Sequence, residues 1–250
     1  MRSRASTDKT AVCRTLEAAV PTIHPDELTA FITDIGIDQW GVAACPPTRW
    51  SHAPDLPFAI SLGIRMEPSI IAEVENGPTP AYYAEHQRLN ARLRDASEAL
   101  AALLREHGAA AEPIDPADPD PAFTDWTDAR VFPHKTAATQ AGLGWIGKTA
   151  LFVSPTLGPK VRLATVFTDA ALPVGVPVTE GRCGSCRRCV DACPAGAGRD
   201  VTWTAGMPRD ALLDARACER QCDSYRPVAD ICGICIAVCP FGRKPDGARP

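Results

Sequence analysis

The sequence predicts an α+β protein, with a mixed α/β domain over residues 1–178 and a small cysteine-rich domain over residues 179–250. Three observations predict this organisation. Amphipathic helical patterns and short β-rich runs share the first part of the chain. Nine of the 11 cysteines lie between residues 183 and 239. The length of 250 residues is enough for one well-packed domain and a smaller one.

Composition excludes several classes of protein. The net charge of −4 gives no general attraction to nucleic acid or to an anionic membrane. No apolar run approaches the roughly 20 residues needed to span a bilayer. The first ten residues lack the apolar core of a signal peptide. These features predict a soluble, cytoplasmic protein.

The first part of the chain predicts two helices and then two strands. A short, weakly amphipathic helix is expected over residues 1–20, and a clearer one begins at Pro25 and stops at Gly36. The apolar face of this second helix carries Leu28, Phe31, Ile32 and Ile35. Strands are expected at Trp40–Cys45 and Phe58–Ile64.

The best-marked helix follows these strands. Thr79 can cap its start, Pro80 suits its first turn, and Gly108 follows its end. Its expected core face consists of Tyr83, His86, Leu89, Leu93, Ala96, Leu100, Leu103 and Leu104. His86 on this face is expected to be a packed or cofactor-wall histidine rather than a metal ligand.

The Pro/Asp-rich residues 109–121 are expected to form a connector that cannot hold a helix. Helical character returns around Pro133–Ala141. Two β-rich runs, Ala150–Ser154 and Val161–Thr168, are joined by a turn-type loop, Pro-Thr-Leu-Gly-Pro. This arrangement predicts a hairpin.

The cysteines fall into two runs, each ending in Cys-Pro. The first, C-x2-C-x2-C-x3-C-P, consists of Cys183, Cys186, Cys189, Cys193 and Pro194. The second, C-x2-C-x3-C-P, consists of Cys232, Cys235, Cys239 and Pro240. Three closely spaced cysteines can hold three corners of a [4Fe–4S] cubane, and the cysteine before the proline ligates the other cluster in two-cluster ferredoxins. Two runs therefore predict two [4Fe–4S] clusters and a ferredoxin-like electron-transfer module.

Zinc and disulfides are the alternatives for these cysteines. Zinc usually takes paired C-x2-4-C or H-x3-5-H knuckles, which the tripled cysteines and Cys-Pro endings fit poorly. Disulfides belong to oxidising compartments, and nothing in the sequence indicates export. Iron–sulfur ligation is favoured over both.

The crossover rule assigns the ligands of each cluster. Cluster one takes Cys183, Cys186, Cys189 and Cys239. Cluster two takes Cys193, Cys232, Cys235 and either Cys218 or Cys222, because the two runs supply only seven of eight thiolates. Cys13 and Cys45 lie far upstream and are expected to be packed thiols.

Residues 142–149, Gly-Leu-Gly-Trp-Ile-Gly-Lys-Thr, fit both the dinucleotide pattern G-x-G-x-x-G and the P-loop pattern G-x-x-x-x-G-K-[ST]. A P-loop follows a strand and opens a helix, so that helix N–H groups face the phosphates. Here a helix-like segment, 134–141, comes before the motif, and a strand-like segment, 150–154, comes after it. This inverted order disfavours nucleotide binding.

The same motif carries a family resemblance. Ala141–Lys148, AGLGWIGK, resembles the signature of epoxyqueuosine reductases, which are cobalamin-dependent enzymes with two [4Fe–4S] clusters, distantly related to reductive dehalogenases. Softer similarities lie at Phe31–Ala43 and at the helix start Tyr82–Leu89. Leu213–Cys218 is similar to a family motif that ends in a cysteine, which favours Cys218 over Cys222 as the eighth ligand.

The resemblance implies a cobalamin-binding first domain, with a ferredoxin or flavodoxin as electron donor and epoxyqueuosine in tRNA as the substrate. The family's proton donor is an aspartate thirteen residues before the signature alanine, which corresponds to Asp128. A carboxylic acid in a desolvated pocket has a raised pKa and can supply the proton that a reduction needs. The residues expected to contact the cobalamin are Gly142, Gly144, Trp145 and Lys148. Of these, the two glycines would let the backbone approach the corrin closely, and Lys148 would pair with its tail or be solvated.

The chain also departs from the family. It stops at Pro250, without the helical-repeat extension that helps hold tRNA, which predicts a short paralogue. It has Pro133-His134-Lys135 where the family usually has an aliphatic residue, Glu and Arg, and Phe241 follows the second Cys-Pro in place of Trp-Asn. The alternatives are a reductive dehalogenase-like enzyme, a ferredoxin-type electron carrier without its own substrate, and a non-enzymatic corrinoid-handling protein. Dehalogenases are normally exported behind a twin-arginine signal, and a carrier would not need the first domain.

Overall fold

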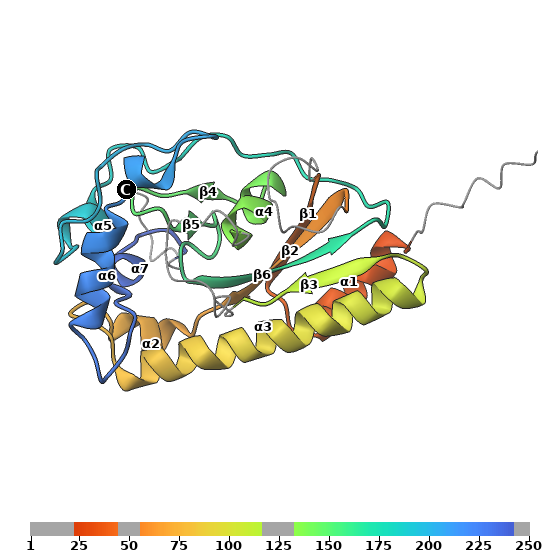
Figure 1. Ribbon diagram of the computed structural model, residues 1–250, viewed down its shortest axis with the longest axis horizontal. Coiled ribbons are helices and arrows are strands. Elements are labelled where there is room, and N and C mark those ends of the chain that lie inside the picture. The colour runs from red at the N-terminus through yellow and green to blue at the C-terminus, as the bar shows by residue number, and fades with distance from the viewer. Residues whose placement is uncertain (1–22, 45–55, 117–132, 243–250) are drawn as a thin grey trace, which may run out of the picture.

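The computed structural model describes residues 23–44, 56–116 and 133–242, which form a mixed arrangement of helices around antiparallel sheets (Figure 1). The predicted α+β class is confirmed. The helix expected over residues 1–20 lies outside the described residues. Among the helices that are described, none combines the length and the apolarity that crossing a bilayer requires.

A four-stranded sheet forms the centre of the first part of the chain. Its order is β1–β2–β6–β3, with every neighbouring pair antiparallel. The strands are β1 (Gln39–Ala44), β2 (Phe58–Arg65), β3 (Ala111–Ile114) and β6 (Val161–Thr168). Residues 59–64 of β2 are all buried, because helices cover both faces of this inner strand. The two strands expected at Trp40–Cys45 and Phe58–Ile64 are thus confirmed as β1 and β2, apart from Cys45, which lies outside the described residues.

Two helices, α1 (Pro25–Asp34) and α3 (Pro80–Glu106), build the main core, and Figure 1 shows the long α3 running beneath the sheet. Thr79 caps α3, its hydroxyl oxygen accepting a hydrogen bond from the Tyr82 N–H at 3.1 Å. The expected core face was wrong at its first position: Tyr82, not Tyr83, is buried. Adjacent residues point about 100° apart around a helix, and only Tyr82 faces the glycine that precedes α7 (Ile234–Ala237).

The opposite face of the sheet is covered by α4 (His134–Gln140), which confirms the helix expected around Pro133–Ala141. A second, two-stranded sheet pairs β4 (Trp145–Ile146) with β5 (Phe152–Val153). The predicted hairpin between the two β-rich runs is therefore wrong. Both edges of β6 are taken by β2 and β3, which leaves β5 to pair with β4.

The connector expected over residues 109–121 contains a strand that the sequence did not predict. β3 pairs with β6 along residues 111–114, although it includes Pro113. The pairing is possible because β3 is an edge strand, where a residue without an N–H leaves no inner partner unsatisfied.

The last part of the chain has short helices joined by long loops. They are α5 (Arg188–Asp191), the 3-10 turn η1 (Arg209–Ala211), α6 (Ala215–Asp223) and α7. The small helix α2 (Pro68–Ala72) contacts α7. One hydrophobic cluster joins this part to the β4–β5 sheet, and it contains Trp145, Phe152, Trp203, Leu212 and Leu213. This cluster has members on both sides of residue 178, and the domain boundary there stays a prediction.

Candidate metal centre

The fold brings the two cysteine runs together. The first run includes α5 and the second includes α7, and these two helices are in contact (Figure 1). Both helices are only four residues long, and Cys-Pro follows each within a few residues. All nine cysteines of the described segments are free thiols and partly buried.

The first group of thiols consists of Cys183, Cys186, Cys189 and Cys239. Burial raises the pKa of Cys189, and the thiols of Cys183 and Cys186 raise it further. Burial also raises the pKa of Cys239 to about 11, with contributions from Cys189 and Cys183 and an opposing one from the Lys160 ammonium. Because such electrostatic effects weaken with distance, these thiols lie near one another. They are the four residues that the sequence assigned to cluster one.

The second group contains five thiols, those of Cys193, Cys218, Cys222, Cys232 and Cys235. Burial raises the pKa of Cys232, and Cys218 and Cys193 add to this effect. A hydrogen bond with Cys222 lowers the pKa of Cys218 to about 7, and the same bond raises the pKa of Cys222. Cys222 also interacts with Cys232, so both candidates for the eighth ligand lie in this group. They are four residues apart on α6, on one face of the helix.

This donor set fits iron–sulfur clusters. Burial disfavours a free thiolate, but a thiol that coordinates a metal is deprotonated outright, since the metal supplies the positive charge. Each group offers at least the four thiolates that a cubane takes. Within segments 23–44, 56–116 and 133–242, no three His, Cys, Asp or Glu side chains are gathered closely enough to hold a single metal ion.

Of the predicted cobalamin contacts, the two glycines face the protein's own backbone. A Cβ at Gly142, where φ is +80°, would lie 2.6 Å from the Val176 carbonyl oxygen. A Cβ at Gly144 would lie 2.2 Å from the Val153 carbonyl oxygen. Close packing of the chain against itself therefore requires both glycines. A contact with cobalamin stays a prediction.

Trp145 points toward the first group of thiols. Its indole N–H donates a hydrogen bond to the Cys183 sulfur over an N···S distance of 3.4 Å. Its ring packs edge-on against Phe241, with 5.0 Å between centroids, and the Arg182 guanidinium lies 6.0 Å from the ring centroid. The side chain is buried, so water does not compete for the indole N–H.

Lys148 is neither solvated nor free to pair with a cofactor tail. Its buried ammonium contacts the Asp200 carboxylate at 2.8 Å, and Arg187 binds the same carboxylate. The hydrogen bond from Lys148, together with Arg187, holds the pKa of Asp200 below its usual range. Through Asp200, Lys148 therefore links the glycine motif to the first cysteine run, because Arg187 lies between Cys186 and Cys189 in that run.

Two residues of this site were missed by the sequence reasoning. Thr149 is buried, and it opposes part of the rise that burial causes in the pKa of Cys189 and of Cys235. Lys160, also buried, donates to the carbonyl oxygen of Cys239 at 2.9 Å. No local pattern identifies either residue, because the partners lie tens of residues further along the chain.

Asp128, the predicted proton donor, lies outside the described residues, as do Cys13 and Cys45. His86 is half-buried and interacts with Asn90, whose side-chain oxygen accepts two hydrogen bonds from Arg162. Burial, and then the charge of Arg162, lower the pKa of His86 to about 3. His86 is therefore a neutral, packed histidine, in accord with the expectation.

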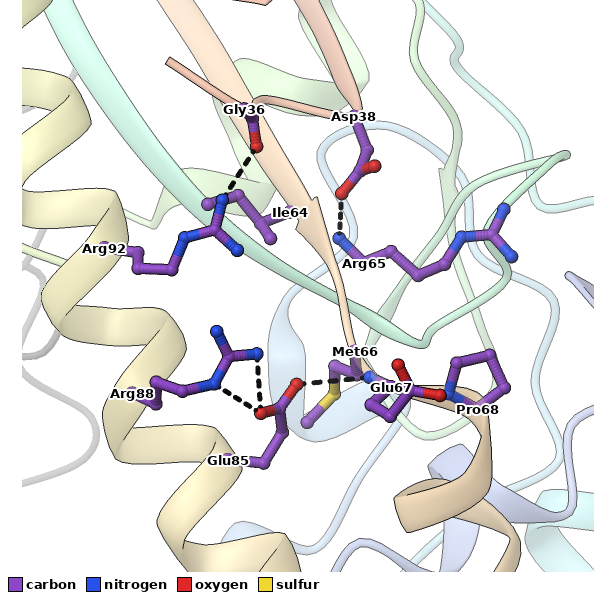
Figure 2. A pocket seen from close by; sticks show the side chains of 10 residues that line it. All are labelled: Gly36, Asp38, Ile64, Arg65, Met66, Glu67, Pro68, Glu85, Arg88 and Arg92. Carbon is purple, nitrogen blue, oxygen red and sulfur yellow. Dashed lines mark hydrogen bonds and ion pairs between the residues drawn. The ribbon is translucent and has the colours of Figure 1, made fainter. Parts of the chain in front are cut away.

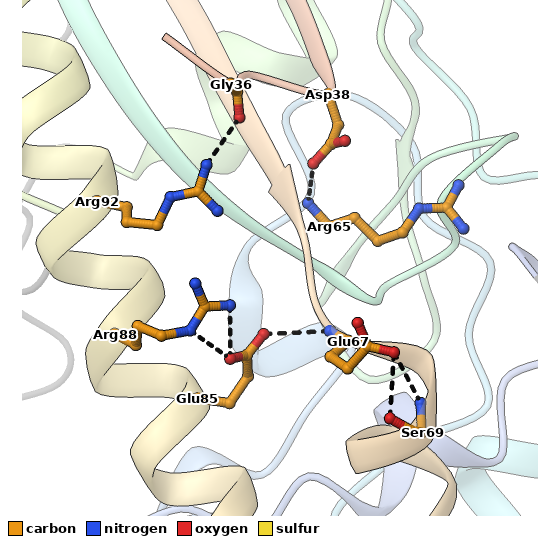
Figure 3. A network of polar contacts seen from close by, with 8 residues as sticks. All are labelled: Gly36, Asp38, Arg65, Glu67, Ser69, Glu85, Arg88 and Arg92. Carbon is orange, nitrogen blue, oxygen red and sulfur yellow. Dashed lines mark hydrogen bonds and ion pairs between the residues drawn. The ribbon is translucent and has the colours of Figure 1, made fainter.

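A separate pocket of about 260 Å³ lies between α3, the end of β2 and the turn before β1 (Figure 2). Several of its polar groups are paired with one another, as Figure 3 shows. The buried Glu85 carboxylate contacts Arg88 at 2.7 Å and accepts from the Glu67 N–H at 3.2 Å. The Asp38 carboxylate accepts from the Arg65 N–H at 2.7 Å. No cysteine lines this pocket.

Comparisons with known proteins agree with the motif. No family model matches the chain. In sequence it is 29% identical over 204 residues to an epoxyqueuosine reductase of Pseudomonas aeruginosa, an alignment that covers 72% of this chain and 48% of that protein. It is 34% identical over 140 residues to an epoxyqueuosine reductase of Bacillus anthracis, covering 51% of this chain and 34% of the relative. In sequence, the chain is similar to epoxyqueuosine reductases.

The chain spans about half or less of the length of these curated relatives. Solved structures show the same fold. A catabolic reductive dehalogenase superposes with a TM-score of 0.72 at 18% identity, covering 90% of this chain and 33% of that one. An epoxyqueuosine reductase bound to an epoxyqueuosine-modified tRNA stem loop superposes with a TM-score of 0.57 at 18% identity, covering 87% of this chain and 64% of that one.

Proposed function

We propose that this chain is an iron–sulfur, cobalamin-dependent reductase that converts epoxyqueuosine in tRNA to queuosine or carries out a related reduction. The observation that carries the proposal is the gathering of nine thiols into two groups beside an AGLGWIGK motif. The similarity in sequence to epoxyqueuosine reductases supports the same class of reaction.

Two [4Fe–4S] clusters would be held by the two groups of thiols. Cys183, Cys186, Cys189 and Cys239 ligate the first cluster. The second takes Cys193, Cys218, Cys232 and Cys235. Cys222 hydrogen-bonds to its neighbour Cys218 and remains the other candidate for that position. The clusters would accept single electrons from a ferredoxin or flavodoxin.

Cobalamin would be bound by residues 1–178. A solved reductive dehalogenase, described in terms of B12-dependent dehalogenation, superposes with a TM-score of 0.71 at 18% identity over 93% of this chain and 33% of that one, which supports a shared scaffold. When bound, the cofactor supplies the difficult redox chemistry of a two-electron step. The protein's own contribution is to hold the donors in place and to supply a proton, for which we propose Asp128.

The proposal is tested with anaerobically purified protein. Iron and sulfide analysis should give about eight of each per chain, as two cubanes require. Incubation with cobalamin should change its visible absorption, and reduced protein should convert an epoxyqueuosine-containing anticodon stem-loop. Stoichiometric zinc without visible absorption would refute the cluster assignment. Loaded clusters without cobalamin binding would reduce the function to electron transfer.

A second candidate is reduction of a halogenated small molecule. The chain is 34% identical over 118 residues to a tetrachloroethene reductive dehalogenase of Sulfurospirillum multivorans, covering 42% of this chain and 22% of that protein. Halide release measured beside the tRNA assay separates the two substrates. Release of halide together with an unchanged stem-loop would favour the dehalogenase.

A further inference from the structure

Two buried lysines reach from the first part of the chain to its cysteine-rich part. Within residues 23–44, 56–116 and 133–242, only Lys148 and Lys160 are buried lysines. Lysine is almost never fully buried unless its ammonium is paired, because burial removes the ammonium from water. In both cases the partners lie in the segments that carry the cysteines. This shared direction indicates a shared task.

Lys148 holds the segment that carries the first three cysteines. It lies in the hydrogen-bonded turn that joins β4 to β5, so its backbone is fixed. Its ammonium binds the Asp200 carboxylate at 2.8 Å, and the other oxygen of that carboxylate binds Arg187. Arg187 lies between Cys186 and Cys189. The two ion pairs therefore hold this segment against the turn.

The backbone of Asp200 supports the importance of these ion pairs. Its φ is +55°, in the left-handed region that residues other than glycine seldom adopt. A residue in such a conformation is kept there by the contacts around it. For Asp200 these contacts are the ion pairs with Lys148 and Arg187.

Lys160 holds the segment that carries the last cysteine. Its ammonium donates to the carbonyl oxygens of Cys239 and Phe241 at 2.9 and 2.8 Å. Its own carbonyl oxygen accepts from the Met66 N–H at 2.9 Å, which fixes its backbone to the end of β2. The two segments are tightly packed, since a Cβ at Gly158 would overlap the Phe241 carbonyl oxygen. The loop that carries Cys239 is therefore held against the start of β6.

The segments that the two lysines hold have to meet for one cluster to form. In the proposed function, the first cluster takes Cys183, Cys186 and Cys189 from one segment and Cys239 from the other. Cys189 and Cys239 are about fifty positions apart, so their neighbours in the sequence do not bring them together. Residues that orient ligands from outside the ligand set strengthen metal binding, because the metal then has less of the site to order.

We infer that Lys148 and Lys160 are positioning residues of the first iron–sulfur cluster, each of which holds one of the two segments that supply its ligands. The inference rests on the proposed function, because it requires the cysteines to hold clusters. It gives the lysine of the P-loop-like pattern a role in holding a cluster rather than a phosphate. Because both lysines hold ligand segments of the first cluster, loss of either should weaken that cluster selectively.

The test measures the release of iron from anaerobically loaded protein to a chelator. Lys148→Met and Lys160→Met keep a long side chain and remove the ammonium. We expect each variant to release about four of its roughly eight irons about ten- to hundredfold faster than wild type, as the loss of a hydrogen bond to a charged group implies. The double variant should also release about four irons quickly and not eight, because both lysines act on the same cluster.

Electron paramagnetic resonance of the reduced protein identifies the cluster that is lost. Cys239→Ala removes a proposed ligand of the first cluster and so provides a reference spectrum of the second cluster alone. After the rapid release, the spectrum of each lysine variant should match this reference. If Lys148→Met failed to fold, Asp200→Asn would break the same ion pair from its partly exposed end, with the same expected result.

Lys135→Met is the matched control. Lys135 is a partly buried lysine whose ammonium donates to the Ala150 carbonyl oxygen at 2.9 Å, within the first part of the chain. The substitution removes an ammonium of the same kind without touching either ligand segment of the first cluster. Lys135→Met should therefore release iron at the wild-type rate.

The outcomes separate this inference from the proposed function. Lysine variants that hold all their iron as wild type does would overturn the inference and leave the function standing. Rapid release from both clusters, or equally rapid release from Lys135→Met, would also overturn it, because the lysines would then act on the stability of the whole protein. A wild-type protein that binds no clusters would overturn both.

Discussion

His134 should make the protein less stable in mild acid. Its imidazole Nδ1 lies 2.9 Å from the Thr165 hydroxyl, and its Nε2 lies 3.3 Å from the Asp115 carbonyl oxygen. These partners suit a neutral ring whose Nε2–H donates to the carbonyl and whose Nδ1 accepts from the hydroxyl. Burial, against an opposing effect of Asp115 and with a smaller contribution from the charge of Arg162, lowers the pKa of His134 from 6.5 to about 4.

The direction and size of the effect follow from linkage. Below pH 6.5 the unfolded chain binds a proton at this ring while the folded protein does not, until the pH falls to about 4. The stability is therefore complete above pH 6.5, is lost as the pH falls from 6.5 towards the folded pKa of about 4, and changes no further below it. At about 1.36 kcal/mol per pKa unit, the loss approaches 3 kcal/mol below pH 4 and is about 2 kcal/mol near pH 5.

The assay is urea unfolding of wild type and His134→Gln, at about pH 7 and about pH 5. We expect wild type to lose about 2 kcal/mol more than His134→Gln between these two values. The difference between the two proteins cancels the effect of pH on unfolding free energy that comes from all other titratable groups. Thr165→Val is the control: it removes the hydroxyl but leaves the ring buried, so it should keep most of the wild-type pH dependence. Parallel pH profiles for wild type and His134→Gln would refute the reasoning.

Three further predictions concern the candidate site. Cys218→Ser should disrupt the second cluster, seen as loss of about four irons per chain, while Cys222→Ser should largely spare it; the reverse result would exchange the two assignments. Isothermal titration of ATP with Mg²⁺ should detect no binding to wild type or to Lys148→Ala, because Lys148 is occupied by Asp200, and binding that depended on Lys148 would restore the P-loop reading. Asp128→Asn should keep the clusters and cobalamin while lowering turnover about 10²–10⁴-fold, and full activity would remove Asp128 as the acid.

Local signals account for the elements that the sequence predicted well. Pro25 and Gly36 limit α1, and Thr79 with Gly108 limits α3, because caps and turns act through neighbouring residues. The strand β3 could not be predicted in the same way. Residues 111–114 form a strand only because they pair with β6, about fifty residues further along the chain. Locally, Pro113 disfavours a strand.

The predictions for the candidate site show the same difference between local and long-range interactions. Cysteine spacing is local, and it predicted two sets of cluster ligands; the fold brings the two cysteine runs into contact through α5 and α7, and the assignment of each thiol to a cluster stays a prediction. The contacts around these groups are not local: Lys160 and Cys239 are 79 positions apart, and Lys148 and Asp200 are 52 apart. AGLGWIGK drew attention to the right segment, but only the fold shows that the indole N–H of Trp145 faces the Cys183 sulfur.

The hydrophobic cluster shared by the β4–β5 sheet and the last part of the chain has a consequence for synthesis. Trp145 and Phe152 leave the ribosome about fifty residues before Trp203, which is roughly 3–10 s earlier at ordinary rates of translation. During that interval the apolar face they form has no cover, and the later cysteines do not yet exist. A nascent chain that pauses after Phe152 and before Trp203 would expose this apolar surface. A chaperone that binds apolar segments would bind it there. Slow codons that pause synthesis before Trp203, Leu212 and Leu213 have emerged should therefore increase aggregation, whereas slow codons reached after these residues have emerged should have less effect.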